Sequence, residues 1–336
     1  MPRISAWEGP VLRSVVPVVE ASRHVGTSRD AVDRVARWMA YEDFAPPDGS
    51  IEGPFDFGPR PDVIIDATLL ISSLNFAYTD FESGERFETD YLGRTWADAE
   101  ALYARIHQAH LGDTPIFDGG FLASVSRPEL GLIFEGSIEI PMLDERVRIL
   151  NEIGAVLVER YDGCFHNLVR SCEPAAYADG NGLLERLTSE FPRFNDVSDH
   201  HGRTVVFNKL GQLCLWSLHV ALSGTGVFAV SDLDHLTAFP DYILPVALEA
   251  MGILEYTDDL SYRIAGQELI DRDSDEEIEI RSHTIYATAL LTDAINAIRP
   301  VDRQVVIPQV DFRLWSTYHA AFPTLRPHHL TRTTMY

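Results

Sequence analysis

The chain has 336 residues, of which 46% are hydrophobic, and a formal net charge of −24. This length and hydrophobic content predict a folded protein with a sizeable core, built as one large domain or as two lobes. The acidic surplus argues against a nucleic-acid-binding surface, because such surfaces neutralise phosphates with basic side chains. It leaves room for a local basic pocket that holds a single phosphate.

Cysteine usage and hydropathy bear on the compartment. The cysteines Cys164, Cys172 and Cys214 are odd in number and form no C-x-x-C pair, so they predict neither a disulfide framework nor a zinc site. The first 22 residues lack the long apolar segment of a signal peptide, and no stretch is apolar enough to span a membrane. We therefore expect a cytoplasmic protein without a membrane partner.

Helical periodicity dominates the first half of the chain. Residues 28–41 predict a helix with Ser28 as its N-cap, and residues 44–62 form a Pro- and Gly-rich loop, long enough to suggest a function. The further elements expected here are a buried helix over 62–78, a hairpin over 86–96 that closes near Gly93, a helix over 95–113 capped by Thr95 and ended by Gly112, and a helix over 142–163 ended by Gly163.

The second half predicts further helices over residues 242–254 and 280–298. The acidic run over 271–279 is typical of a solvated face or a loop. The sequence contains no repeat, low-complexity tract or clear linker. We therefore predict a mainly α protein in which residues 1–336 form a single two-lobed domain with a small β element.

Motifs of several common enzyme classes are missing. The chain contains no Walker loop, G-x-G-x-x-G, H-E-x-x-H or G-x-S-x-G motif. The histidines include two adjacent pairs, His200 with His201 and His328 with His329. Neighbours in sequence do not share a helix face, so these pairs do not predict a metal site.

Two carboxylates stand among aromatic residues. Asp241 lies between Phe239 and Tyr242, and on a helix Asp311 would share a face with Trp315 and Tyr318. A carboxylate beside rings suits a cationic or heteroaromatic ligand, since rings stack and the carboxylate accepts N–H donors. The structural alternative is that Asp241 caps a helix that starts at Ile243, and that Trp315 and Tyr318 belong to the core.

Lys209 is the single lysine of the chain, which otherwise uses arginine for its basic side chains. The choice of arginine elsewhere is consistent with codon bias, in which case Lys209 is a leftover. The alternative is a site that rejects a guanidinium, because lysine is a compact charge on a thin stem whereas arginine is wide and planar.

Several motifs together resemble one known family. They are "SLNFAY", "PMLDERVRILNEIG", "FNKLGQ", "AFPDYILPVALEAMGILEYTDDL", "EIEIRS", "VDFRLW" and "HHLTRTTMY", in this order. Their order and number are similar to those of the queuosine salvage proteins, the queuosine 5′-phosphate N-glycosylases/hydrolases, from about residue 22 to the last residue. The chain departs from the pattern over residues 46–59, where a histidine of the family has no counterpart.

The resemblance implies a hydrolase that cuts the N-glycosidic bond of queuosine 5′-monophosphate and releases queuine for tRNA modification. It also implies an α-helical fold similar to the helix-hairpin-helix DNA glycosylases, and a mechanism that needs no metal or cofactor. Three alternatives stay open: a non-catalytic queuine- or queuosine-binding protein, a nucleic-acid base glycosylase, which the negative charge disfavours, and a structural α-domain.

The resemblance also implies roles for individual residues. Asp311 would face the sugar, where a carboxylate stabilises or attacks the oxocarbenium-like centre, and Asp241 would accept the donors of the base edge, with Phe239 stacking on the base. The reverse assignment of the two aspartates stays open. The other candidates are Phe312 and Ser316 in the base pocket with Tyr242 and Trp315, Asn75 and Phe76 in its wall, and Lys209, His329, Arg332 and Tyr336 for the phosphate or for support of an aspartate.

Overall fold

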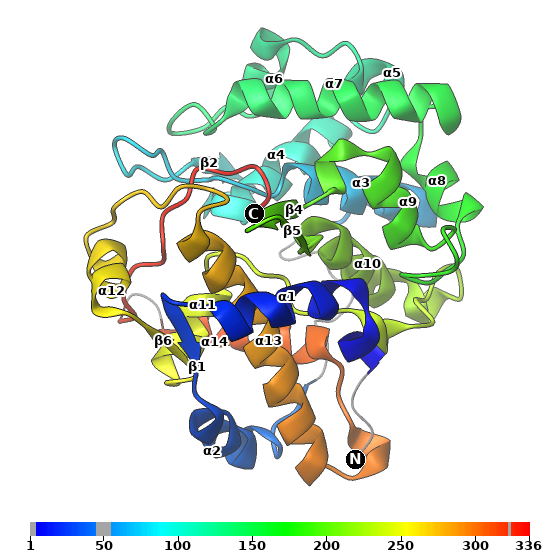
Figure 1. The fold of residues 1–336 in the computed structure, drawn as a ribbon. Coiled ribbons are helices and arrows are strands. Elements are labelled where there is room, and N and C mark those ends of the chain that lie inside the picture. The colour runs from blue at the N-terminus through cyan, green and yellow to red at the C-terminus, as the bar shows by residue number, and fades with distance from the viewer. Residues whose placement is uncertain (1–4, 45–54, 322–323) are drawn as a thin grey trace. The chain divides into compact units, whose positions relative to one another are not determined.

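The computed structural model describes residues 5–44, 55–321 and 324–336, apart from the side chains of 319 and 320. Figure 1 shows a chain that is mostly helical, with a few short strands. It divides into two compact units. Unit 1 comprises Met1–Pro46, Asp196–Gln212 and Asp232–Arg332, and unit 2 comprises Pro47–Asn195, Leu213–Ser231 and Thr333–Tyr336.

Unit 1 contains both the N-terminal helices and most of the C-terminal third. Its strands pair as β1 with β6 and β4 with β5, both antiparallel. Its elements are η1 (Ser5–Glu8), α1 (Pro10–Ala21), β1 (Val25–Thr27), α2 (Arg29–Met39), β4 (Val197–His200), β5 (Arg203–Val206), the first turn of α10 (Lys209–Leu222), η4 (Leu233–His235), α11 (Leu244–Ala250), β6 (Leu254–Tyr256), α12 (Asp258–Ala265), α13 (Asp275–Ile298), η5 (Val301–Arg303) and α14 (Ile307–Ala321).

Helix α13 is the centre of unit 1 and contacts α1, α2, α11 and α14. It is buried along most of its length although it carries three inward threonines. The hydroxyls of Thr284, Thr288 and Thr292 each donate to the carbonyl four residues earlier, at 2.7–2.8 Å. Because the helix satisfies these three hydroxyls itself, the threonines can face the apolar core at little cost.

Unit 2 is built from the middle of the chain. Its strands pair as β2 with β3, in an antiparallel hairpin. Its elements are α3 (Pro61–Leu74), β2 (Glu88–Tyr91), β3 (Arg94–Ala97), α4 (Asp98–Leu111), α5 (Gly119–Leu122), α6 (Arg127–Ile133), α7 (Leu143–Arg160), α8 (Phe165–Ser171), α9 (Leu183–Glu190), η2 (Pro192–Phe194), the remainder of α10 and η3 (Ser223–Thr225).

In unit 2, a buried arginine of α7 binds the carbonyls at the C-terminal end of helix α3. The guanidinium of Arg146, on α7, donates to the carbonyls of Leu74 (2.6 Å), Phe76 and Ala77 (2.8 Å). The carbonyl of Leu74 belongs to the last turn of α3 and would otherwise lack an intrahelical donor, and the carbonyls of Phe76 and Ala77 follow directly after the helix. Helix α7 also lies close to α5, because a side chain at Gly154 would come within 2.2 Å of the backbone nitrogen of Ala123.

Many predicted elements are confirmed. The chain is mainly helical with a small β element, Ser28 caps α2 through the N–H of Ala31, and Gly112 follows the last residue of α4. The hairpin over residues 88–97 turns at Leu92 and Gly93, which both have positive φ. Residues 45–54 of the predicted loop lie outside the described residues. The single-domain organisation and the similarity to helix-hairpin-helix glycosylases stay predictions.

Three details of the prediction are wrong. Thr95 does not cap α4 but lies in β3, where its hydroxyl donates to Asp90. The predicted helix over residues 242–254 is shorter, because the chain leaves α11 to pair β6 with β1. The acidic run does not stay in solvent: its second half is the start of α13, and the carboxylate of Glu279 accepts three backbone N–H groups of residues 23–25.

Among the residues that the structure describes, no helix is both long and apolar enough to cross a bilayer.

Candidate active site

Asp311 occupies a buried position on the second turn of α14. Asp311 is only 5% exposed, and its Oδ2 accepts a hydrogen bond of 2.7 Å from the backbone N–H of Phe239. Burial raises the pKa of Asp311 well above its usual range, the Phe239 N–H lowers it, the neighbouring Asp241 raises it, and Lys209 lowers it. The structure thus brings both predicted aspartates and the single lysine within electrostatic reach of one another.

The segment that faces Asp311 is held by polar side chains. Gln212 accepts from the backbone N–H of Thr237 at 2.8 Å and donates to the carbonyl of Phe207 at 2.9 Å. The guanidinium of Arg281, on α13, lies 3.3 Å from the carbonyl of Pro240. Residues 237–240 are buried together with these partners. The N–H that contacts Asp311 is therefore fixed before any ligand binds.

Lys209 begins helix α10 and is 4% exposed. Its backbone N–H donates to Oδ2 of Asp196 at 3.2 Å. Asp196 in turn forms a buried two-point ion pair with Arg281, at 3.0 and 2.5 Å. This ion pair holds Asp196 and thereby the start of α10 at Lys209. Lys209 is thus a buried charge near Asp311, and a wider head group at this buried position would have to displace its neighbours.

Asp241 is half-buried and has a structural role. Its Oδ1 accepts from the backbone N–H groups of Ile243 (2.8 Å) and Leu244 (3.0 Å), at the start of α11. The predicted alternative, a helix cap, is therefore present. The cap uses only Oδ1, so it does not rule out a ligand contact at Oδ2.

The predicted aromatic residues of unit 1 lie on α14 or just before α11. The rings of Phe312 and Trp315 stack at a centroid distance of 6.0 Å, and Ser316 donates to the carbonyl of Phe312 at 2.8 Å. Trp315 also packs against the core of unit 1, as the structural alternative predicted. The ring of Tyr242 lies 4.4 Å from the ring of His328.

The candidates for the phosphate differ in accessibility. His329 is buried, and burial, with the charges of His328 and Arg281, lowers its pKa to about 3. It is therefore neutral near pH 7 and can contribute a hydrogen bond but no positive charge. Arg332 is exposed.

Three predicted residues belong to unit 2. Asn75 follows α3 and accepts from the hydroxyl of Tyr78 at 2.8 Å. The ring of Phe76 is buried, and the guanidinium of Arg146 lies 4.2 Å from its centre. Tyr336 is buried as well. Within their own unit, Asn75 and Phe76 serve the packing around the end of α3, and their contribution to a base pocket stays a prediction.

Sequence reasoning missed the residues that support the site. Gln212 and Arg281 stand inside the motifs "FNKLGQ" and "EIEIRS", but nothing in their spacing indicates that they hold residues 237–240. Asp196 has no local signal at all, because its partner Arg281 is 85 residues away. Such long-range pairs are found only when the fold is known.

Two groups among the described residues could hold a metal ion. One consists of Asp66, Cys164 and His166 in unit 2, and the other of His200, His201 and Asp275 in unit 1. Adjacent histidines fail to share a face only on a helix, and His200 and His201 lie on no helix. They lie at the turn between β4 and β5, so the prediction that they form no metal site rests on a wrong premise.

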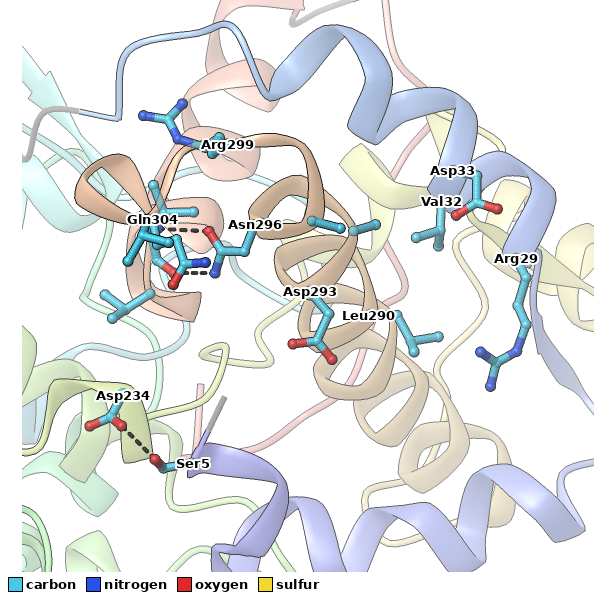
Figure 2. A pocket seen from close by; sticks show the side chains of 15 residues that line it. Ser5, Arg29, Val32, Asp33, Asp234, Leu290, Asp293, Asn296, Arg299 and Gln304 are labelled. Atoms are coloured by element: carbon cyan, nitrogen blue, oxygen red, sulfur yellow. Dashed lines mark hydrogen bonds between the residues drawn. The ribbon is translucent and has the colours of Figure 1, made fainter. Parts of the chain in front are cut away.

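A separate pocket of about 830 Å³ opens elsewhere in unit 1, and Figure 2 shows its lining side chains around α13. Asp33, Asp234, Asp293, Arg29 and Arg299 contribute its charged groups. None of the residues that line it is one of the predicted site residues. Its acidic excess does not suit a phosphate-bearing substrate.

Comparison with known proteins decides the family. The family model described as queuosine salvage protein matches residues 59–336, which is most of the chain. The chain belongs to the queuosine salvage protein family. The match contains Asp241, Asp311 and Lys209, and it begins within the last residues of the Pro- and Gly-rich segment.

Several members of the queuosine salvage protein family resemble this chain over most of their length. The queuosine 5′-phosphate N-glycosylase/hydrolase of Sphaerobacter thermophilus is 34% identical over 326 residues, which is 97% of both chains. The protein of the same name from Mus musculus is 27% identical, over 95% of this chain and 96% of its own length. The one from Schizosaccharomyces pombe is 30% identical, over 75% of this chain and 73% of its own length. Relatives of this chain therefore occur in both bacteria and eukaryotes.

Proposed function

We propose that this chain hydrolyses the N-glycosidic bond of queuosine 5′-monophosphate and releases queuine. Family membership supports this activity, as do relatives named queuosine 5′-phosphate N-glycosylase/hydrolase. The observation that carries the proposal for this chain is the buried carboxyl of Asp311, aligned by the Phe239 N–H and flanked by the charges of Asp241 and Lys209. A cytoplasmic location stays a prediction.

In this proposal Asp311 acts on the sugar. As the C–N bond breaks, positive charge develops on the ribose ring, and a fixed carboxylate in a site of low polarity stabilises that charge or attacks the carbon. The Phe239 N–H and Lys209 both favour the ionised form of Asp311 against the effect of burial. Burial outweighs these two groups and raises the pKa of Asp311, so the anion that acts on the sugar depends on the Phe239 N–H, on Lys209 and on the positive charge that develops on the substrate.

Asp241 is proposed to recognise the base. A 7-deazaguanine edge presents N–H donors, and a carboxylate oxygen accepts them. Because the helix cap occupies Oδ1, the donors would have to converge on Oδ2. Phe239, two residues away, would then stack on the base. The reverse assignment of the two aspartates remains an alternative.

One experiment separates the proposed enzyme from its alternatives. The purified chain is incubated with queuosine 5′-monophosphate, and free queuine is measured by mass spectrometry. Release of queuine with turnover supports the enzyme, while binding without release identifies a carrier. The absence of both, together with base release from RNA or DNA, would assign the chain to the nucleic-acid glycosylases. A chain that neither binds nor releases would be a structural domain.

A further inference from the structure

A tight turn in unit 1 places two histidines side by side. His201 and Gly202 join β4 to β5, and both have positive φ (54° and 79°), as a two-residue hairpin turn of this type requires. The rings of His200 and His201 lie 4.2 Å apart. Asp275, the first residue of α13, faces both of them.

The distances among these three side chains suit a bridging cation. Nε2 of His200 lies 3.7 Å from Oδ1 of Asp275, and Nε2 of His201 lies 3.6 Å from Oδ2. These distances are too long for hydrogen bonds. A zinc ion holds nitrogen and oxygen ligands at about 2.0–2.2 Å, so neighbouring ligands of a tetrahedral site lie roughly 3.4 Å apart. The candidate ligand atoms of all three residues lie within 4.8 Å of one another, so side-chain movements could bring them to this spacing.

His200 supplies an independent sign of a missing partner. Its side chain is only 6% exposed, and its buried Nε2 has no hydrogen-bond partner among the described residues. A buried polar atom without a partner is rare and calls for an explanation. This atom points at Asp275 from a distance that one ion would bridge. One oxygen of Asp275 lies near each histidine, so a single carboxylate can complete the set.

The electrostatic surroundings favour a positive ligand. Neutral imidazole is the form of histidine that binds metals. The carboxylates of Asp275, Glu279 and Asp199 all act electrostatically on the ring of His200. A divalent cation would offset their negative charge.

We propose that His200, His201 and Asp275 bind one divalent transition-metal ion, of which Zn²⁺ is the representative. The site uses two imidazoles and one carboxylate, a ligand set that zinc accepts, with water at the remaining position. It is distinct from the proposed reacting groups, and the inference does not depend on the proposed activity.

The ion would fasten the β4–β5 hairpin to the start of α13. The opposite end of the hairpin is already joined to α13 by the ion pair between Asp196 and Arg281. Between these two points, Ser198 donates to Asp273 at 2.6 Å. The same hairpin leads directly into Lys209. A bound metal would therefore stabilise the segment that positions this lysine.

The second cluster of possible ligands serves as a comparison. In the group of Asp66, Cys164 and His166, both oxygens of Asp66 already accept hydrogen bonds from His166, at 2.7 and 2.8 Å. The carboxylate of Asp66 and Nδ1 of His166 are therefore partnered without a metal. Cys164 nevertheless offers a thiol that could bind Zn²⁺, so the experiment must distinguish the two groups.

The experiment titrates the metal-free full-length chain with Zn²⁺ by calorimetry. The test variants are His201→Asn and Asp275→Asn. Asparagine is chosen at position 201 because it tolerates the left-handed backbone. The side chains of His201 and Asp275 are 63% and 43% exposed, so folding should persist. The matched controls are His235→Asn and Cys164→Ser. We expect one Zn²⁺ per chain, a rise in melting temperature on binding, and a loss of affinity on the order of tenfold or more in each test variant, with both controls unchanged.

Two results would overturn the proposal. The first is a wild-type chain that takes up no Zn²⁺. The second is uptake of Zn²⁺ that persists in both His201→Asn and Asp275→Asn. If Cys164→Ser abolishes that uptake, the ion binds at the group of Asp66, Cys164 and His166 instead. Titration with Co²⁺ gives a further distinction, because thiolate-to-metal charge-transfer absorption would reveal that Cys164 is the ligand.

Discussion

The backbone N–H of Phe239 lies 2.7 Å from Oδ2 of Asp311, and both residues are buried. The segment that carries this N–H is itself held by Gln212 and Arg281. The carboxyl of Asp311 is therefore aligned by backbone, which a substitution of the Phe239 side chain does not remove. Such alignment costs no reorganisation when charge develops on a substrate.

Replacement of Asp311 by alanine should lower kcat by on the order of 10²–10³ or more, the scale for loss of one preorganised electrostatic group. Folding should persist, because the substitution removes a carboxyl whose burial is unfavourable to its charged form. Single-turnover release of queuine from queuosine 5′-monophosphate measures the effect, with circular dichroism as the control for folding. A rate within tenfold of the wild type would remove Asp311 from the mechanism.

The pH dependence should report the ionisation of Asp311. If the anion is the active form, kcat/KM rises with pH through the pKa of Asp311, and burial places that rise above the ordinary carboxyl range near 4. Lys209 lowers this pKa and Asp241 raises it, so Lys209→Met should move the acid limb to higher pH and Asp241→Asn should move it to lower pH. A limb that both variants leave in place would assign the titration to another group.

Asp241→Asn should mainly damage recognition of the base. An amide still accepts at its oxygen, but it presents an NH₂ group to a donor edge where the carboxylate presented a second acceptor. Queuine retains the base and lacks the sugar, so its affinity isolates this contact. We expect clearly weaker binding of queuine by calorimetry. Unchanged queuine affinity together with reduced turnover would exchange the roles of the two aspartates.

His283 should make unit 1 sensitive to acid. Burial lowers its pKa to about 4, and its ring nitrogens contact the hydroxyls of Thr27 and Ser22 at 2.7 and 2.9 Å. The unfolded chain binds this proton near pH 6.5 while the folded chain resists it, so stability falls as the pH drops from 7 towards 4.

Between pH 7 and pH 5 this histidine should cost about 2 kcal/mol of the free energy of unfolding. Urea unfolding at several pH values measures the effect. His283→Gln should flatten the dependence by that amount, whatever its effect on stability at pH 7. An equally steep dependence in the variant would show that His283 is not responsible.

The elements whose cause is local were predictable from the sequence. Ser28 caps a helix through a residue three positions away, and Gly93 forms a turn because its backbone has a positive φ. The acidic run over 271–279 failed because its surroundings are distant: Glu279 is buried against the backbone of residues 23–25, more than 250 positions earlier. No local pattern contains that contact.

The same distinction applies to the candidate site. Aromatic neighbours predict Asp311 and Asp241, and Lys209 stands out as the single lysine of the chain. The family resemblance implies a role for all three, and the structure brings their charges together. The ion pair of Asp196 with Arg281, on which the entry to α10 rests, joins residues 85 positions apart. The metal-ligating potential of His200 and His201 was missed because it depends on a hairpin rather than on a helix.

Lys209→Arg tests whether the single lysine of the chain is required. The substitution keeps the charge, but Lys209 is 4% exposed, so a wide, planar head group must displace its neighbours or the ligand. Overpacking of this kind typically costs about 1–3 kcal/mol, which corresponds to a loss of roughly five- to 150-fold in kcat/KM if the strain acts at the ligand. We expect such a loss with little change in melting temperature, measured against Arg203→Lys as a matched exposed control. Full activity of Lys209→Arg would show that the lysine is an accident of codon usage.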